Sequence, residues 1–160
     1  MQTIDPERAA IARVSLADIV RRGARRHPGK TAVIQGERRI SFAELDAGSE
    51  RVGEALRDQG FTGHRIATLC LNSIEHLSAI QAIHKSGNVW VPVNVQLDAA
   101  AIEHVLSHAE VGAVFIDAAL HAVPALRALI ERLGLLTVVI GGPQPAAAGT
   151  LPFDALASRA

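Results

Sequence analysis

Two patterns of apolar residues alternate along the chain: recurrence every three or four positions, and short continuous runs. The first is typical of helices that bury one face, and the second of strands covered on both sides. The predicted helices span residues 15–26, 41–59, 74–85, 98–109, 117–133 and 153–157. The predicted strands span residues 31–34, 38–40, 65–71, 89–93, 112–116 and 136–140. This order predicts an α/β fold with a layered, largely parallel sheet of about five to seven strands, flanked by helices and preceded by a hairpin.

Polar residues mark where two of these helices begin. Ser41 and Glu44 have the spacing of a capping box, in which each side chain bonds the backbone N–H of the other residue. Ser15 and Asp18 have the same spacing, with Asp in place of the usual Glu. We therefore expect side-chain caps at both positions.

The first predicted helix has an apolar face and a basic face. Its apolar face comprises Leu16, Ile19, Val20 and Gly23. Its basic face, the Arg21–Arg26 face, comprises Arg21, Arg22, Arg25 and Arg26, and Lys30 follows shortly after. This acid-free run could attract anionic lipid head groups or a phosphate. The alternative is an ordinary solvated face that acids elsewhere in the fold balance.

The composition fits one soluble domain of 160 residues. The hydrophobic fraction is 49%, enough for a core, and 16 basic residues cancel 16 acidic ones, which argues against a nucleic-acid partner. The single cysteine excludes a disulfide framework and is typical of a reducing compartment. We expect a polar leader over residues 1–14, a single α/β domain over residues 15–160 and, without an apolar signal segment, a cytoplasmic location.

Several histidines lie on predicted helices, and two of them have metal-ligand spacing. His104 and His108 are four residues apart, so both rings could reach one metal ion. Two ligands without a third are weak support, and we expect a solvated helix face instead. His76 and His84 receive the same interpretation.

Cys70 and Trp90 are each the only residue of their type. Cys70 could act as a nucleophile, but it lies in an apolar strand, so we expect a core position. Trp90 could line a pocket, although a core role is our prediction. The sequence contains no Walker phosphate loop, dinucleotide-binding glycine motif, nucleophile elbow or H-E-x-x-H zinc motif. We therefore assign no catalytic, cofactor-binding or metal-binding residue.

Several segments, in this order and spacing, resemble the N-terminal region of the AMP-forming acyl-CoA synthetases, a branch of the adenylate-forming enzymes. The most specific is KSGNVWVPVN at residues 85–94, which is similar to the family pattern K-x-G-A-x-x-V-P-L-N. The others are residues 41–45, 56–60, 66–73, 102–109 and 113–117. Asn94 favours acyl-CoA synthetases over peptide-synthetase domains, which usually have Asp there. Leu71 replaces a usual Pro, and His64 a usual Asp.

The resemblance implies part of the large N-terminal domain of a two-step ligase, with long-chain fatty acids as the expected substrates. A carboxylate would attack ATP to form an acyl-adenylate, and coenzyme A would then displace AMP. The complete enzyme would need ATP, Mg²⁺ and coenzyme A. The family's phosphate loop, adenine-binding segment, ribose-binding segment and C-terminal lysine domain have no counterpart here. We therefore expect an N-terminal fragment that acts as scaffold and cleft wall, that is inactive alone, and whose partner is the missing C-terminal part.

Two other interpretations remain open. The chain could be a stand-alone, non-catalytic module that binds a partner or forms a homodimer through an uncovered apolar face. It could also associate peripherally with a membrane through the Arg21–Arg26 face.

Overall fold

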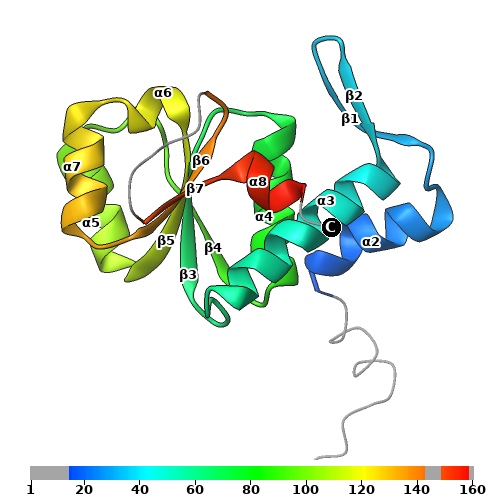
Figure 1. The fold of residues 1–160 in the computed structure, drawn as a ribbon, viewed down its shortest axis with the longest axis horizontal. Helices are drawn as coiled ribbons and strands as arrows, with labels where there is room; N and C mark the ends of the chain where they lie inside the picture. Colours follow the sequence, from blue (N-terminus) through cyan, green and yellow to red (C-terminus); the bar gives the residue numbers. More distant parts are fainter. Residues whose placement is uncertain (1–14, 143–148, 159–160) are drawn as a thin grey trace, which may run out of the picture.

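In the computed structural model, which describes residues 15–142 and 149–158, five parallel strands form the central sheet (Figure 1). Its strands are β3 (Arg65–Leu69), β4 (Val89–Pro92), β5 (Val111–Asp117), β6 (Leu136–Ile140) and β7 (Thr150–Pro152). Their spatial order is β4-β3-β5-β6-β7, and each neighbouring pair is parallel. This arrangement confirms the α/β fold and the parallel sheet that the sequence predicts.

Helices cover both faces of the sheet (Figure 1). One face carries α3 (Phe42–Asp58), α4 (Ile74–Lys85) and α8 (Phe153–Ala157). The other carries α5 (Ala99–His108), α6 (Ala118–His121) and α7 (Pro124–Arg132). A further helix, α2 (Ala17–Arg26), packs against the outer side of α3.

An antiparallel hairpin stands apart from the central sheet. It consists of β1 (Thr31–Gln35) and β2 (Arg38–Ser41), with Gln35 opposite Arg38 at its turn. Gly36 in the turn has a φ of 58°, a left-handed conformation that glycine adopts without strain. In Figure 1 the hairpin projects away from the five-stranded sheet, beyond the start of α3.

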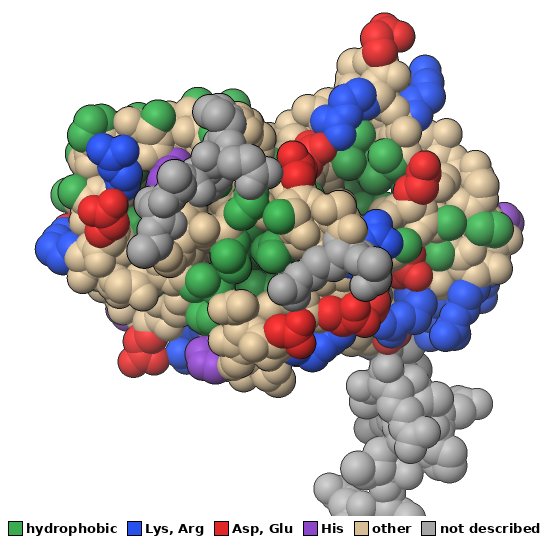
Figure 2. All heavy atoms as spheres, viewed as in Figure 1, with side chains coloured by type: hydrophobic (Ala, Val, Ile, Leu, Met, Phe, Trp, Pro, Cys, Tyr) green, Lys and Arg blue, Asp and Glu red, His purple; other side chains and the backbone are tan. Residues whose placement is uncertain are grey.

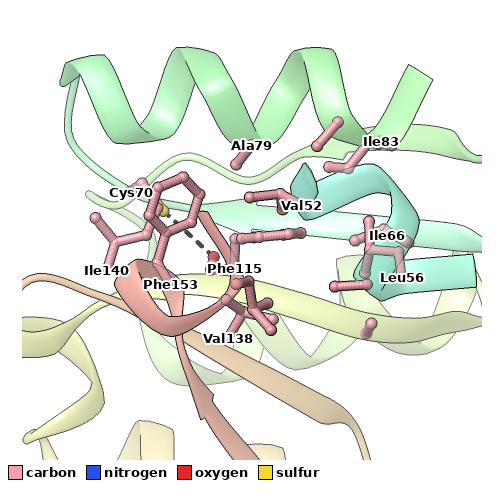
Figure 3. Close-up of a cluster of buried hydrophobic side chains, with 14 residues drawn as sticks. Val52, Leu56, Ile66, Cys70, Ala79, Ile83, Phe115, Val138, Ile140 and Phe153 are labelled. Carbon is pink, nitrogen blue, oxygen red and sulfur yellow. Dashed lines mark hydrogen bonds between the residues drawn. The ribbon is translucent and has the colours of Figure 1, made fainter. Parts of the chain in front are cut away.

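The strands separate two hydrophobic cores because successive side chains of a strand point to opposite faces. Along β5, Ala113 and Phe115 belong to the core under α3, α4 and α8, whereas Val114 and Ile116 belong to the core under α5 and α7. Figure 3 shows Phe115 in the first core, where its ring lies edge-on to that of Phe153 with centroids 6.4 Å apart. Burial of β3 and β5 on both faces explains their continuous apolar sequences.

The predicted caps form to different degrees. At α3 the capping box is complete: Ser41 Oγ accepts from Glu44 N at 3.2 Å, and Glu44 Oε2 accepts from Ser41 N at 2.7 Å. At the first helix only half of the box forms, because Asp18 Oδ2 accepts from Ser15 N at 2.9 Å and no side chain caps α2. Consequently α2 begins at Ala17 rather than at Ser15.

The apolar face predicted for α2 is only partly buried. Val20 is buried, but Leu16 and Ile19 are 57% and 58% exposed, which corrects their expected place in the core. The reason is that α2 is buried through other positions: Ala17 and Val20 are covered, and Gly23 packs against the Phe42 ring.

One strand was not predicted, and another is shorter than expected. We expected a Gly/Pro/Ala loop before Phe153, but Thr150–Pro152 forms β7 beside β6. It pairs over only three residues, and its flanking Gly149 gives it the local appearance of a turn. β3 ends at Leu69 rather than at Leu71. Pro92, which has no backbone N–H to donate, ends the edge strand β4. The leader predicted over residues 1–14 lies outside the described residues.

Candidate cleft wall at the carboxyl edge of the sheet

Two adjoining hollows lie where the hairpin meets the central sheet. The hairpin cavity has a volume of about 370 Å³ and lies between β1, α4 and Trp90 of β4. The strand-end groove has a volume of about 510 Å³ and is more open. Gln35, Asn72 and Ser73 line both hollows, so the two form one continuous depression.

The strand-end groove follows the carboxyl ends of three parallel strands. Leu71 lies just after β3, Asp117 ends β5, and Gly141 and Gly142 follow β6. Open parallel sheets bind ligands at this edge, where the loops after neighbouring strands meet. The groove is therefore the candidate functional site of the described residues.

The reactive side chains around the groove are already engaged. Asp117 Oδ2 accepts a hydrogen bond from Leu71 N at 2.6 Å, which ties the end of β5 to the loop after β3. Cys70 Sγ donates to Phe115 O at 3.3 Å inside the core, as Figure 3 shows. Burial raises the pKa of the Cys70 thiol, and the charge of Asp117 raises it further. The core position predicted for Cys70 is confirmed, and the protonated thiol is not a nucleophile.

The N-terminus of α4 lies at the depression, and two of its N–H groups already have acceptors. Ile74 N donates to Gln35 Oε1 at 3.0 Å, and His76 N donates to Ser73 Oγ at 3.0 Å. Glu75 adds a carboxylate to the same first turn, where it forms an ion pair with Arg38. A phosphate needs open N–H groups and free cations, but the N–H groups of Ile74 and His76 already have acceptors and Arg38 is paired with Glu75.

Trp90 packs against the core under α3, α4 and α8, as predicted, and it also lines the hairpin cavity. Its side chain is half-buried, and its indole N–H donates to Thr68 Oγ1 at 2.9 Å. His76 Nε2 lies 3.1 Å from the same hydroxyl oxygen. The buried Thr68 therefore fixes both rings against the cavity. This contact joins residues from β3, β4 and α4, and no local pattern in the sequence indicates it.

His76 and His84 are half-buried, which contradicts the solvated face expected for them. Burial lowers the pKa of His76, although the charge of Asp117 and a hydrogen bond with the backbone of Leu71 act in the opposite direction. Burial also lowers the pKa of His84, whose ring lies edge-on to Trp90. Both rings are packed where the sequence predicted water, because α4 is covered by the hairpin and by β4.

His104 and His108 lie on an exposed face of α5, as predicted. Their rings stack with centroids 5.7 Å apart. Among residues 15–142 and 149–158, no group of three His, Cys, Asp or Glu side chains could hold a metal ion. The pair therefore lacks the third ligand that a stable metal site requires.

The Arg21–Arg26 face is less uniformly basic in space than in sequence. Arg21 contacts Asp18 and Glu50, each at 3.3 Å, so acids from α2 and α3 neutralise one of its four arginines. The remaining three, Arg22, Arg25 and Arg26, are exposed. Figure 2 shows basic and acidic side chains side by side over these two helices. No helix in the described part of the chain is long and apolar enough to cross a membrane.

The segment at residues 85–94 is structural. The Lys85 ammonium lies 2.6 Å from Asp46 Oδ1 and 3.6 Å from Glu50 Oε2, joining α4 to α3. Asn88 donates to Phe61 O at 3.0 Å and accepts from His64 N at 2.9 Å, which fixes the loop before β3. Sequence reasoning found the segment by resemblance but could not show that its polar residues hold helices and loops together.

Comparisons with known proteins agree on one family. Residues 20–159 match the family model described as AMP-binding enzyme. The chain is 34% identical over 131 residues to syringomycin synthase SyrB1 of Pseudomonas syringae pv. syringae, a match that covers 79% of this chain and 20% of that protein. The chain thus spans about a fifth of the length of this curated relative.

Solved structures give the same result. A Rhodopseudomonas palustris CGA009 protein with the provisional name long-chain-fatty-acid CoA ligase matches with 29% identity and a TM-score of 0.79, over 91% of this chain and 36% of its own. A benzoate CoA ligase from Burkholderia xenovorans LB400 matches with 27% identity and a TM-score of 0.78, over 92% of this chain and 29% of its own. These structures confirm that the fold is the one found in the N-terminal domain of adenylate-forming enzymes.

Proposed function

The chain belongs to the AMP-binding enzyme family, and from this premise we propose that its 160 residues form the first part of the N-terminal domain of an ATP-dependent acyl-CoA synthetase. In the proposed reaction, a fatty-acid carboxylate attacks the α-phosphate of ATP and releases pyrophosphate. The thiol of coenzyme A then attacks the acyl carbonyl and releases AMP, losing its proton to solvent. We propose a cytoplasmic setting for this reaction.

The described residues do not supply the chemistry of either step. At the strand-end groove, Asp117 accepts from the backbone of Leu71, and the Cys70 thiol lies in the adjacent core, where it donates to Phe115 O. The N–H groups of Ile74 and His76 at the start of α4 already have acceptors. Among the described residues, no group of three His, Cys, Asp or Glu side chains could hold a metal ion. This geometry supports a role as scaffold and cleft wall. The observation that carries the proposal is the groove at the carboxyl edge of the parallel sheet, where the Asp117 carboxylate is held by the backbone of Leu71.

The choice of a fatty acid and of coenzyme A has weaker support than the family. Asn94 favours an acyl-CoA synthetase, and two of the similar structures are named as CoA ligases. SyrB1 is named as a syringomycin synthase, so an amino acid with a carrier-protein thiol as acceptor is the competing choice.

The test measures the exchange of pyrophosphate into ATP and asks which carboxylic-acid substrate this exchange requires. An antibody against residues 15–160 would isolate the native polypeptide from its source cells, and its size would be compared with the 16.9 kDa of this chain. We expect a larger polypeptide whose exchange depends on fatty acids and which forms acyl-CoA. Exchange that requires an amino acid and does not occur with fatty acids would contradict the proposal that the substrate is a fatty acid. Exchange catalysed by the isolated 160-residue chain would contradict the scaffold role.

A second candidate is peripheral membrane binding, which the exposed Leu16 and Ile19 favour. These apolar side chains lie on α2 together with the exposed Arg22 and Arg26, and amphipathic helices use this combination at anionic lipid surfaces. Co-sedimentation with vesicles containing phosphatidylserine is the test. Binding that is unchanged in the double variant Arg22→Glu, Arg26→Glu would refute it.

A further inference from the structure

The hairpin cavity has apolar walls on three sides. β1 contributes Val33 and Ile34, α4 contributes Leu77 and Ile80, and β4 contributes Trp90. Ile34 is 57% exposed, so the wall formed by the hairpin has no cover among the described residues. In Figure 2 apolar side chains gather at the base of the hairpin. The volume of about 370 Å³ falls within the usual range of small-molecule pockets, roughly 300–1,000 Å³.

The electrostatics of the cavity favour an uncharged occupant. Of the described residues that line it, none is Lys, Arg, Asp or Glu. The His76 ring faces the cavity in its neutral form near pH 7, because burial lowers its pKa. The N–H groups of Ile74 and His76 are also taken by protein acceptors. A charged ligand would lose its hydration here without gaining a counter-charge.

The polar groups of the cavity are few and fixed. The hydroxyl of Thr68 holds the Trp90 indole and the His76 imidazole in place, so neither ring has to be ordered when a ligand binds. The amide of Asn72 lies exposed at the rim that the cavity shares with the strand-end groove. An amide offers both a donor and an acceptor, which suits a ligand with one hydroxyl or amide group.

We propose that the hairpin cavity is a binding site for a small uncharged molecule with an apolar ring and one hydrogen-bonding group. The ring lies between Trp90 and the apolar side chains of α4, and the polar group reaches Asn72. The site is separate from the proposed ligase chemistry, because it needs neither ATP nor a carboxylate.

Trp90 makes the proposal directly testable, since it is the only tryptophan in the sequence. The 160-residue chain would be titrated with benzyl alcohol while the emission of Trp90 is recorded. We expect a saturable change, together with a rise in the unfolding temperature as the ligand concentration increases. Benzoate and benzylamine carry the same ring with a negative or positive charge, and we expect each to bind at least about tenfold more weakly, which corresponds to about 1.4 kcal/mol.

Two pairs of variants separate the cavity from non-specific binding. Leu77→Phe fills the cavity and should abolish the response, whereas Leu97→Phe, outside the cavity, should leave it unchanged. Ile34→Asp places a charge at an exposed position of the cavity wall and should weaken binding about tenfold, whereas Leu97→Asp should not. Because Ile34 is exposed, its variant keeps the test valid if Leu77→Phe fails to fold.

Three results would overturn the proposal. The first is a response to benzyl alcohol that does not saturate or that survives Ile34→Asp. The second is equal binding of benzoate, which would show that the cavity does not select uncharged ligands. The third is Trp90 emission that changes with protein concentration in the absence of ligand, which would show that a second copy of the chain occupies the cavity.

Discussion

The buried ammonium of Lys85 provides a sharp test of how α3 and α4 are held together. Its side chain has no exposed surface, while its partners Asp46 and Glu50 are 27% and 35% exposed. Lys85 Nζ donates to Asp46 Oδ1 at 2.6 Å and to Asp46 O at 2.7 Å, and Glu50 Oε2 is 3.6 Å away. The pair is therefore asymmetric, because water can reach the carboxylates but not the ammonium.

This asymmetry predicts which of two substitutions lowers the stability of the protein more. Asp46→Ala leaves a buried ammonium with one carboxylate at 3.6 Å and a carbonyl, and it should cost about 3 kcal/mol, at the low end of the range for a broken buried pair. Lys85→Met removes the buried charge itself and leaves carboxylates that water can solvate. It should therefore cost only about 1–1.5 kcal/mol. The double variant should be more stable than the sum of the single effects predicts, by about 1–2 kcal/mol.

The assay is urea unfolding followed by circular dichroism, with the wild type and four variants under one set of conditions. Glu54→Ala, at an exposed position of α3, is the matched control and should change stability by no more than about 0.5 kcal/mol. The reasoning is refuted if Lys85→Met costs as much as Asp46→Ala, or if the two effects are additive. Either result would mean that the ammonium is hydrated in solution and that packing alone joins the helices.

Gly23→Ala should destabilise the protein by about 1–3 kcal/mol, because the added Cβ would lie 2.4 Å from the Phe42 ring. In Gly48→Ala the added Cβ meets no atom within 4 Å, so this variant should stabilise α3 by about 0.4–1 kcal/mol. Urea unfolding titrations measure both changes. Cys70 should resist a thiol-specific reagent until urea unfolds the chain, because burial raises its pKa, and labelling in native buffer would contradict this. Burial lowers the pKa of His76, so the stability that its neutral form contributes is present above the ordinary histidine pKa of 6.5 and is lost as the pH falls through the lower folded pKa. Unfolding midpoints at pH 7 and pH 5 should therefore differ less in His76→Gln than in the wild type.

The elements that the sequence predicts well are those whose signals are local. The capping box of Ser41 and Glu44 starts α3 at the expected residue, and the side chain of Ser73 caps α4 by accepting from His76 N. Both depend on contacts three residues apart, which the sequence displays directly. β7 depends instead on pairing with β6, and no pattern within its three residues distinguishes it from a loop. Leu16 and Ile19 have the spacing of a buried face, yet the packing of α2 on α3 leaves them exposed.

The hairpin cavity could not be predicted because its parts come from separate elements. Thr68 lies on β3, His76 on α4 and Trp90 on the edge strand, and only the parallel pairing of β3 with β4 brings them within hydrogen-bond distance. Each side chain taken alone has an ordinary core or surface interpretation. The solvated position expected for His76 is wrong because the hairpin covers part of α4, whereas Trp90 packs against the core as expected but also lines the cavity that the hairpin leaves open.

The segment at residues 85–94 carries the most specific resemblance to the family, yet the contacts of its side chains are structural. Lys85 joins two helices, Asn88 fixes the loop before β3, and Pro92 ends the edge strand. Each of these tasks demands a particular residue type: a long cation, a side-chain amide, and a residue without a backbone N–H. Such demands follow from the fold and are the same for any substrate. In the proposed ligase, the choice between a fatty acid and an amino acid must therefore depend on other residues. Exchange of Lys85, Asn88 or Pro92 should lower the stability of the domain in urea unfolding without changing which acid the complete enzyme selects in pyrophosphate exchange.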